Sequence, residues 1–73
     1  MTVTSEAATT WTGSLTEGSG TVAFSSSQLG TFPISWKARS EGSDTVTTPE
    51  ELIAAAHASC FSMALSHALA ENG

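Results

Sequence analysis

Residues 48–73 read TPEELIAAAHASCFSMALSHALAENG, and this stretch decides the fold. Thr48 is a preferred helix N-cap residue, and Pro49 suits the first helical position. Glu51 follows three residues after the cap, where a capping box places its acid. The closing Asn-Gly pair supplies a stop signal. The sequence therefore predicts a helix over residues 49–71, roughly 34 Å long at 1.5 Å per residue.

The predicted helix is uncharged along most of its length. Between Leu52 and Ala70 the sequence contains no Asp, Glu, Lys or Arg, so a membrane span has to be considered. We reject a span because alanine dominates the stretch and because it has neither basic flanks nor an aromatic belt. Polar side chains also interrupt it: His57, Ser59, Ser62, Ser66 and His67. A helix that is apolar nearly all round is otherwise buried in protein, so we expect a buried central helix.

The residues before this helix are rich in Thr, Ser, Gly and Val, and they alternate in a way typical of strands. We expect strands at residues 9–15, 21–25 and 32–40, with a glycine turn at residues 17–20. Pro33 indicates an edge strand or a strand beginning. The predicted fold is α+β, with an antiparallel three-strand β-meander followed by one long buried central helix.

Length and charge restrict the remaining possibilities. A chain of 73 residues forms at most one domain, and its strands can cover only one side of the helix. Two cations against seven acids give a net charge of −5, so nucleic acid and anionic membranes are not expected partners. A single cysteine cannot form an intrachain disulfide, and residues 1–10 lack the pattern of a signal peptide. We therefore expect a cytoplasmic protein.

Cys60 is the one thiol of the chain and the first candidate for chemistry. Its simplest interpretation is a small apolar residue packed among alanines, because free cysteines are often buried. Reactivity would require a thiolate stabilised by positive charge or hydrogen-bond donors. The helix dipole fades within the first turn, and Cys60 lies about three turns in. The candidates are Arg39 and His57, which precedes Cys60 by three residues on the same face. Spacing alone leaves both interpretations open.

A metal site is a further candidate. His67 lies near the angular position of Cys60 but about 10 Å farther along the helix axis. One helix therefore cannot bring His57, Cys60 and His67 to a single ion with ligand bonds near 2 Å. A zinc site would need His57 and Cys60 from two chains. We predict no metal and no cofactor, and we keep this interface metal site as an alternative.

Arg39 and Glu50 lie on either side of the predicted strand-to-helix connection. In one interpretation they form a pair in which the carboxylate fixes the guanidinium fork. In the other, Arg39 is a solvated side chain on the polar face of the third strand, and Glu50 is a first-turn acid favoured by the helix dipole. The residues alone leave both interpretations open.

Three segments together resemble the OsmC/Ohr family of organic hydroperoxide reductases. Residues 48–65 are similar to the family's central helix, residues 11–22 (WTGSL, then GSGTV) to its opening hairpin, and residues 32–42 to the strand before the helix. His57 is typical of the OsmC branch, since the Ohr branch tends to have tyrosine there. Family members are about twice this length, so the chain resembles the N-terminal half of one OsmC-like domain.

The resemblance implies a thiol-dependent peroxidase that reduces organic hydroperoxides to alcohols. Cys60 corresponds to the peroxidatic cysteine, Glu50 to the helix-start glutamate and Arg39 to the arginine on the preceding strand, with His57 as a supporting neighbour. A second, resolving cysteine is expected in the family's later half and does not occur in this chain. The resemblance also implies a homodimer with active sites at the interface, a dithiol reductant of the lipoyl type, and no cofactor.

Helix geometry adds a constraint. Ten residues separate Glu50 from Cys60, which is about 15 Å along a straight axis. Either the chain bends between them or one group comes from a partner subunit. We therefore expect an incomplete OsmC-like fold that turns over peroxide poorly, if at all, by itself. The alternative from another class is a noncatalytic assembly module whose exposed apolar helix seeks a partner chain.

Overall fold

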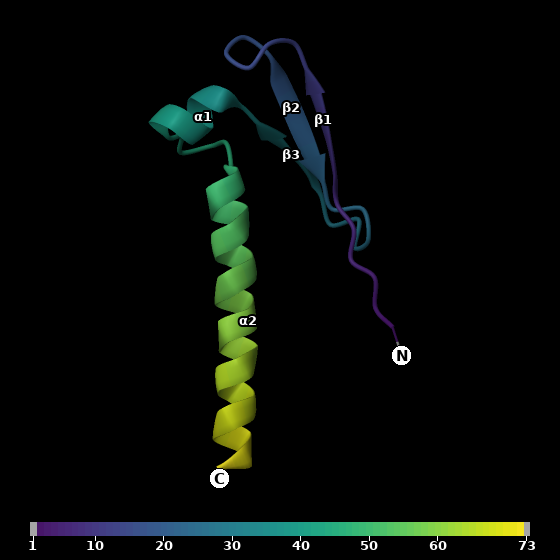
Figure 1. Ribbon diagram of the computed structural model, residues 1–73, viewed down its shortest axis with the longest axis vertical. Helices are drawn as coiled ribbons and strands as arrows, with labels where there is room; N and C mark the ends of the chain where they lie inside the picture. Colours follow the sequence, from purple (N-terminus) through teal and green to yellow (C-terminus); the bar gives the residue numbers. More distant parts are fainter. Residues whose placement is uncertain (1, 73) are drawn as a thin grey trace.

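A computed structural model describes residues 2–72, and it contains a small sheet, a short helix and one long helix (Figure 1). In chain order the elements are β1 (Ala8–Thr12), β2 (Ser19–Ala23), β3 (Thr31–Ile34), α1 (Trp36–Glu41) and α2 (Pro49–Glu71). The strands form an antiparallel sheet in the order β1-β2-β3. The predicted α+β arrangement, a meander followed by a long helix, is confirmed.

The hairpin strands β1 and β2 both end earlier than the predicted ranges 9–15 and 21–25. Gly13 has a φ of +96°, a conformation that favours glycine, and it ends β1. The backbone N–H of Gly18 donates to the Ser14 carbonyl at 2.8 Å and closes the turn. The chain therefore reverses over residues 13–18, slightly before the predicted glycine turn.

Gly20 fixes the packing at the centre of the sheet. It lies opposite Trp11 of β1 and Ile34 of β3. A Cβ atom at this position would stand 2.6 Å from the Thr10 carbonyl oxygen and 2.7 Å from the Trp11 ring. Only glycine fits there, which explains why a residue that usually weakens a strand stands inside β2.

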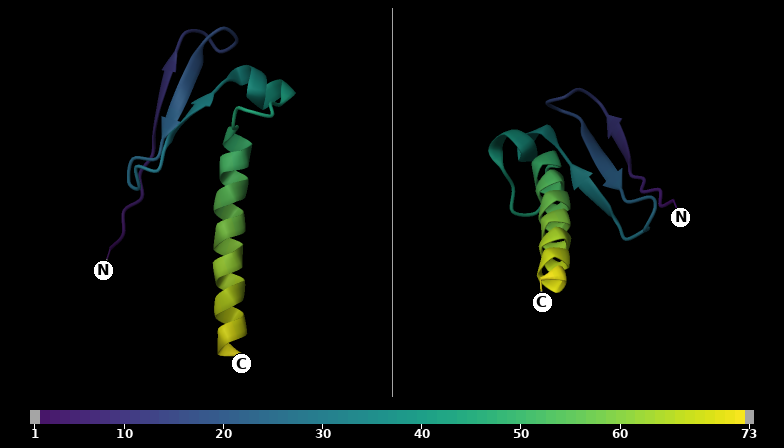
Figure 2. Two further views of the ribbon diagram at one scale, coloured as in Figure 1. Left: turned by 180° about the vertical axis from the view of Figure 1, so that it is seen from behind. Right: turned by 60° about the horizontal axis from the view of Figure 1, so that its bottom comes forward.

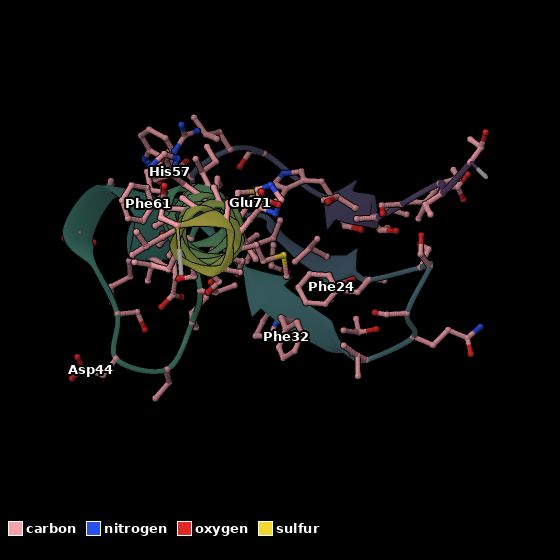
Figure 3. The ribbon with its side chains drawn as sticks, turned by 90° about the horizontal axis from the view of Figure 1, so that it is seen from below. Phe24, Phe32, Asp44, His57, Phe61 and Glu71 are labelled. Atoms are coloured by element: carbon pink, nitrogen blue, oxygen red, sulfur yellow. The ribbon has the colours of Figure 1, made fainter. Side chains whose placement is uncertain are left out.

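The interior of the molecule is small. Among residues 2–72 only Val22 and Ala38 are buried, at 7% and 3% exposed. Next to Val22 in the sheet, Phe32 packs against Phe24 with ring centroids 5.3 Å apart and planes inclined by 51° (Figure 3). Fully burying one valine or phenylalanine contributes only about 1.5–3 kcal/mol. These contacts stabilise the sheet. They do not involve the long helix.

The third predicted strand, residues 32–40, is wrong beyond Ile34. Ser35 acts as a helix N-cap, because its Oγ accepts a hydrogen bond at 3.1 Å from the backbone N–H three residues later. The chain then turns into α1, which ends at Gly42 with a φ of +90° (Figure 2). The apolar and polar alternation of this stretch fits a short helix as well, and its Lys-Ala-Arg sequence favours helix. Arg39 therefore lies on a helix rather than on a strand.

α2 begins and ends where the sequence predicts. Thr48 is its N-cap, and the Thr48 hydroxyl accepts a hydrogen bond from the Glu51 backbone N–H at 3.0 Å. Pro49 is the first helical residue. The Glu51 carboxylate accepts a hydrogen bond from the Thr47 hydroxyl at 2.5 Å, which ties the preceding loop to the first turn. From there the helix runs without interruption to Glu71.

The expected burial of α2 is not met within this chain. None of its described residues is buried, and the helix runs away from the sheet in both side views (Figures 1 and 2). The sequence allowed the strands to cover at most one side of α2, and in the structure they bury none of it; α1 lies between β3 and α2 in the chain. The exposed side chains of α2 include several large apolar ones: Ile53, Phe61, Met63, Leu65 and Leu69.

The exposed area confirms how open the molecule is. Its accessible surface is 5956 Å², whereas a folded monomer of 7.5 kDa is expected to expose roughly 4,200 Å². The radius of gyration is 16.0 Å, against about 11 Å for a compact chain of this length. By length and composition alone, α2 could also cross a membrane. Within residues 2–72, no element buries α2.

Removing the cap should destabilise α2 without touching its apolar side chains. Thr48→Ala deletes the acceptor of the Glu51 N–H, so we expect the free energy of unfolding to fall by about 1 kcal/mol. Urea unfolding of the protein measures this loss. Thr48→Ser is the matched control, because it keeps the hydroxyl, and it should retain most of the stability. Equal stabilities for the two variants would contradict the capping role.

Candidate active site

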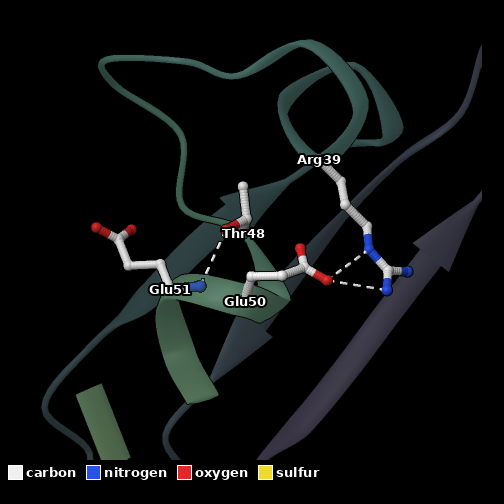
Figure 4. A network of polar contacts seen from close by, with 4 residues as sticks. All are labelled: Arg39, Thr48, Glu50 and Glu51. Atoms are coloured by element: carbon white, nitrogen blue, oxygen red, sulfur yellow. Dashed lines mark hydrogen bonds and ion pairs between the residues drawn. The ribbon is translucent and has the colours of Figure 1, made fainter. Parts of the chain in front are cut away.

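An ion pair joins α1 to the start of α2. The Nε and Nη2 atoms of Arg39 both lie 3.0 Å from Oε2 of Glu50 (Figure 4). The two side chains are 51% and 58% exposed. Of the two interpretations left open by the sequence, the structure shows the pair. These contacts involve two of the three guanidinium nitrogens, so other N–H groups of Arg39 are left to bind an anionic or polar group.

Local signals in the sequence bring these two side chains together. Gly42 ends α1, and the Ser43 hydroxyl then accepts hydrogen bonds from the backbone N–H groups of Thr45 and Val46, both at 3.1 Å. This turn returns the chain to the Thr48 cap, where α2 starts. Arg39 in the last turn of α1 therefore faces the first turn of α2. Exposed pairs contribute only about 0.2–1 kcal/mol, so the contact orients the guanidinium more than it stabilises the fold.

A small apolar pocket lies beside Arg39. Its volume is about 110 Å³. Two tryptophans belong to its lining, and the Trp11 indole N–H donates to the backbone carbonyls of Gly13 and Ser14 at 3.1 and 3.3 Å. The hydrogen bonds hold that ring in place. The guanidinium thus stands at the rim of an apolar surface. The full lining is Trp11, Leu15, Ile34, Ser35, Trp36, Arg39 and Pro49.

Cys60 does not join this pair. It is a free, exposed cysteine on α2, ten residues after Glu50. Because α2 is continuous, the two residues are about 15 Å apart along its axis. The bend that would bring them together is not present. Within one chain, the structure places two of the candidate residues side by side and leaves the candidate nucleophile apart.

The two histidines of α2 have different surroundings. The His67 imidazole lies 3.8 Å from the Glu71 carboxylate, one turn later. His57 lies one turn before Cys60 and is exposed. No group of three metal-binding side chains occurs within residues 2–72. A metal site built on His57 and Cys60 would therefore need a second chain.

Sequence reasoning missed the roles of two serines next to Cys60. The Ser59 hydroxyl donates to the Ala55 carbonyl, and the Ser62 hydroxyl donates to the Ala58 carbonyl, each at 2.8 Å. Such bonds to the fourth preceding residue are common for serine in a helix interior, and this spacing was the available signal. They leave the surface around Cys60 less polar than its composition suggests.

Comparison with known proteins agrees with the sequence pattern. Two curated relatives, from Escherichia coli (strain K12) and Shigella flexneri, are both named Peroxiredoxin OsmC, and each is 47% identical to this chain over 73 residues. The whole chain is thus similar to part of these OsmC proteins, and it spans about half their length. No protein-family model and no solved structure matches it.

The Arg39–Glu50 contact should appear as a salt-dependent coupling. A double-mutant cycle with Arg39→Gln and Glu50→Gln should give a coupling free energy of about 0.2–1 kcal/mol in urea unfolding at low salt. In 1 M NaCl, where the Debye length is about 3 Å, the coupling should shrink toward zero. The control cycle pairs Arg39→Gln with Glu51→Gln, whose carboxylate contacts Thr47, and should show no coupling. Equal couplings in the two cycles would contradict a specific pair.

Proposed function

We propose that the full-length protein carrying this chain is a cysteine-based peroxidase that reduces organic hydroperoxides to alcohols. The observation that carries this proposal is the similarity to Peroxiredoxin OsmC, which extends over all 73 residues. The exposure of Cys60, the only thiol of the chain, supports it, because a peroxidatic sulfur has to meet its substrate. Cys60 is the proposed nucleophile.

The proposed reaction has two stages. The Cys60 thiolate attacks the distal oxygen of the hydroperoxide, so that an S–O bond forms, the O–O bond breaks and an alkoxide leaves. Cys60 is then a sulfenic acid, and the alkoxide takes up a proton to become the alcohol. The resolving cysteine that the resemblance implies condenses with the sulfenic acid, releases water and forms a disulfide with Cys60. A dithiol reductant then opens this disulfide by thiol–disulfide exchange, is itself oxidised to a disulfide, and returns both cysteines to thiols.

Arg39 and Glu50 complete the proposed site. A guanidinium beside the sulfur would stabilise the thiolate and the charge that develops on the leaving oxygen, and Glu50 already orients it. Because α2 keeps Cys60 about 15 Å from this pair in its own chain, we assign Arg39 and Glu50 of one subunit to Cys60 of another. The active unit is then a homodimer, and a single 73-residue chain should be inactive.

The exposed surface of α2 supports an assembly of this kind. The chain exposes roughly 1,700 Å² more than a compact monomer of its mass, and stable interfaces bury about 800 Å² or more per partner. A protein partner explains the helix better than a bilayer, because the sequence around it lacks basic flanks and aromatic belts. We accordingly place the protein in the cytoplasm, without nucleic-acid or membrane partners.

The second candidate function is a noncatalytic assembly module. The observation that favours it is the same exposed helix, which would bind a partner chain without using Cys60. The two proposals differ in one product. Only the peroxidase forms a sulfenic acid on Cys60 when peroxide is added.

Substituting the nucleophile separates these functions. We expect the full-length protein to reduce cumene hydroperoxide with a dithiol reductant, and Cys60→Ser to fall to the rate of the uncatalysed reaction, because serine has no thiolate to attack the peroxide. Dimedone should label Cys60 in the unmodified protein after peroxide treatment. Ser62→Ala is the control, since its hydroxyl is used inside the helix. Equal turnover by wild type and Cys60→Ser, without dimedone labelling, would favour the assembly module.

A further inference from the structure

The proposed reaction needs a proton donor that Arg39 cannot be. When the O–O bond breaks, the leaving alkoxide is a strong base, and protonation in the transition state makes it a better leaving group. A guanidinium remains protonated in proteins, so Arg39 can stabilise the charge but not supply a proton. Another side chain near Cys60 has to fill this role unless water does.

The hydroxyl groups nearest to Cys60 are already used. Ser59 and Ser62 donate their hydroxyl protons to backbone carbonyls one turn earlier, both at 2.8 Å. The carboxylate of Glu50 is already in contact with the Arg39 guanidinium. His67 is seven residues from Cys60, about 10 Å along the axis, and lies beside a carboxylate.

His57 is placed where such a donor is needed. It precedes Cys60 by three residues on an uninterrupted helix, a spacing that puts the two Cβ atoms about 5–6 Å apart. Helical side chains lean toward the N-terminus, so the sulfur of Cys60 lies over the turn that carries His57. Within residues 2–72 the imidazole has no ion-pair partner. Figure 3 shows His57 projecting from the same side of α2 as Phe61, an apolar neighbour.

We propose that His57 is the general acid of this reaction, an inference that rests on the proposed peroxidase function. Cys60 reacts as its thiolate beside the Arg39 guanidinium of the other subunit, and His57 enters the step as the imidazolium, which carries the proton to be transferred. As the thiolate attacks the distal oxygen, the imidazolium gives that proton to the alkoxide oxygen. The products are the Cys60 sulfenic acid, the alcohol and a neutral imidazole. The step needs no other proton source.

Two oxidants with different leaving groups test this role. tert-Butyl hydroperoxide releases a strongly basic alkoxide, whereas peracetic acid releases acetate, which leaves without protonation. In single-turnover oxidation of Cys60 in the full-length protein, His57→Gln should slow the first reaction about a hundredfold and the second by about threefold or less. His67→Gln is the matched control and should leave both rates unchanged.

Each outcome decides the proposal. Unchanged rates in His57→Gln would overturn it, because water would then be the donor, and equal losses with both oxidants would overturn it by showing a merely structural effect. If His57→Gln does not fold, His57→Ala with added imidazole replaces it, and rescue of the tert-butyl hydroperoxide rate supports the proposal while its absence overturns it. Failure of the peroxidase function itself looks different, since the wild-type protein would then form no sulfenic acid with either oxidant.

Discussion

The molecule depends on one constraint, an apolar helix that its own chain does not cover. From Leu52 to Ala70 the sequence carries no acid, lysine or arginine, and none of these residues is buried. Side chains such as Phe61 and Met63 are exposed to water, at a cost that burial against another surface would remove. The sheet buries few side chains, and the helix does not pack against it. The molecule is therefore open.

The same helix determines the geometry of the chemistry. As a continuous rod it separates Cys60 from the Arg39–Glu50 pair, so these groups can act together only across an interface. A second subunit that covers the helix would then also complete the site. Burial would also lower the local dielectric around the thiolate and the guanidinium, which strengthens their attraction once they meet. Assembly and catalysis are coupled in this account through the surface of one helix.

The sequence predicts the parts of the fold that local chemistry determines. Thr48 and Pro49 set the start of α2 because capping involves only neighbouring backbone groups. Alternation over residues 32–40 predicts a strand, but a short helix begun by Ser35 accommodates the same pattern. The pairing of Arg39 with Glu50 depends on how the loop between α1 and α2 turns, and charge alone left it undecided. The burial of α2 could not be predicted correctly, because an apolar pattern all round a helix does not say what packs against it.

Mixing two inactive variants tests the interface site most directly. Cys60→Ser and Arg39→Ala full-length proteins should each be inactive alone, since each lacks one half of every site. After subunit exchange at equal amounts, half of the dimers combine the two variants, and each mixed dimer has one intact site if Cys60 and Arg39 act across the interface. We therefore predict about a quarter of the wild-type peroxidase rate. No recovery of activity, despite mixed dimers formed in the same sample, would contradict the shared site.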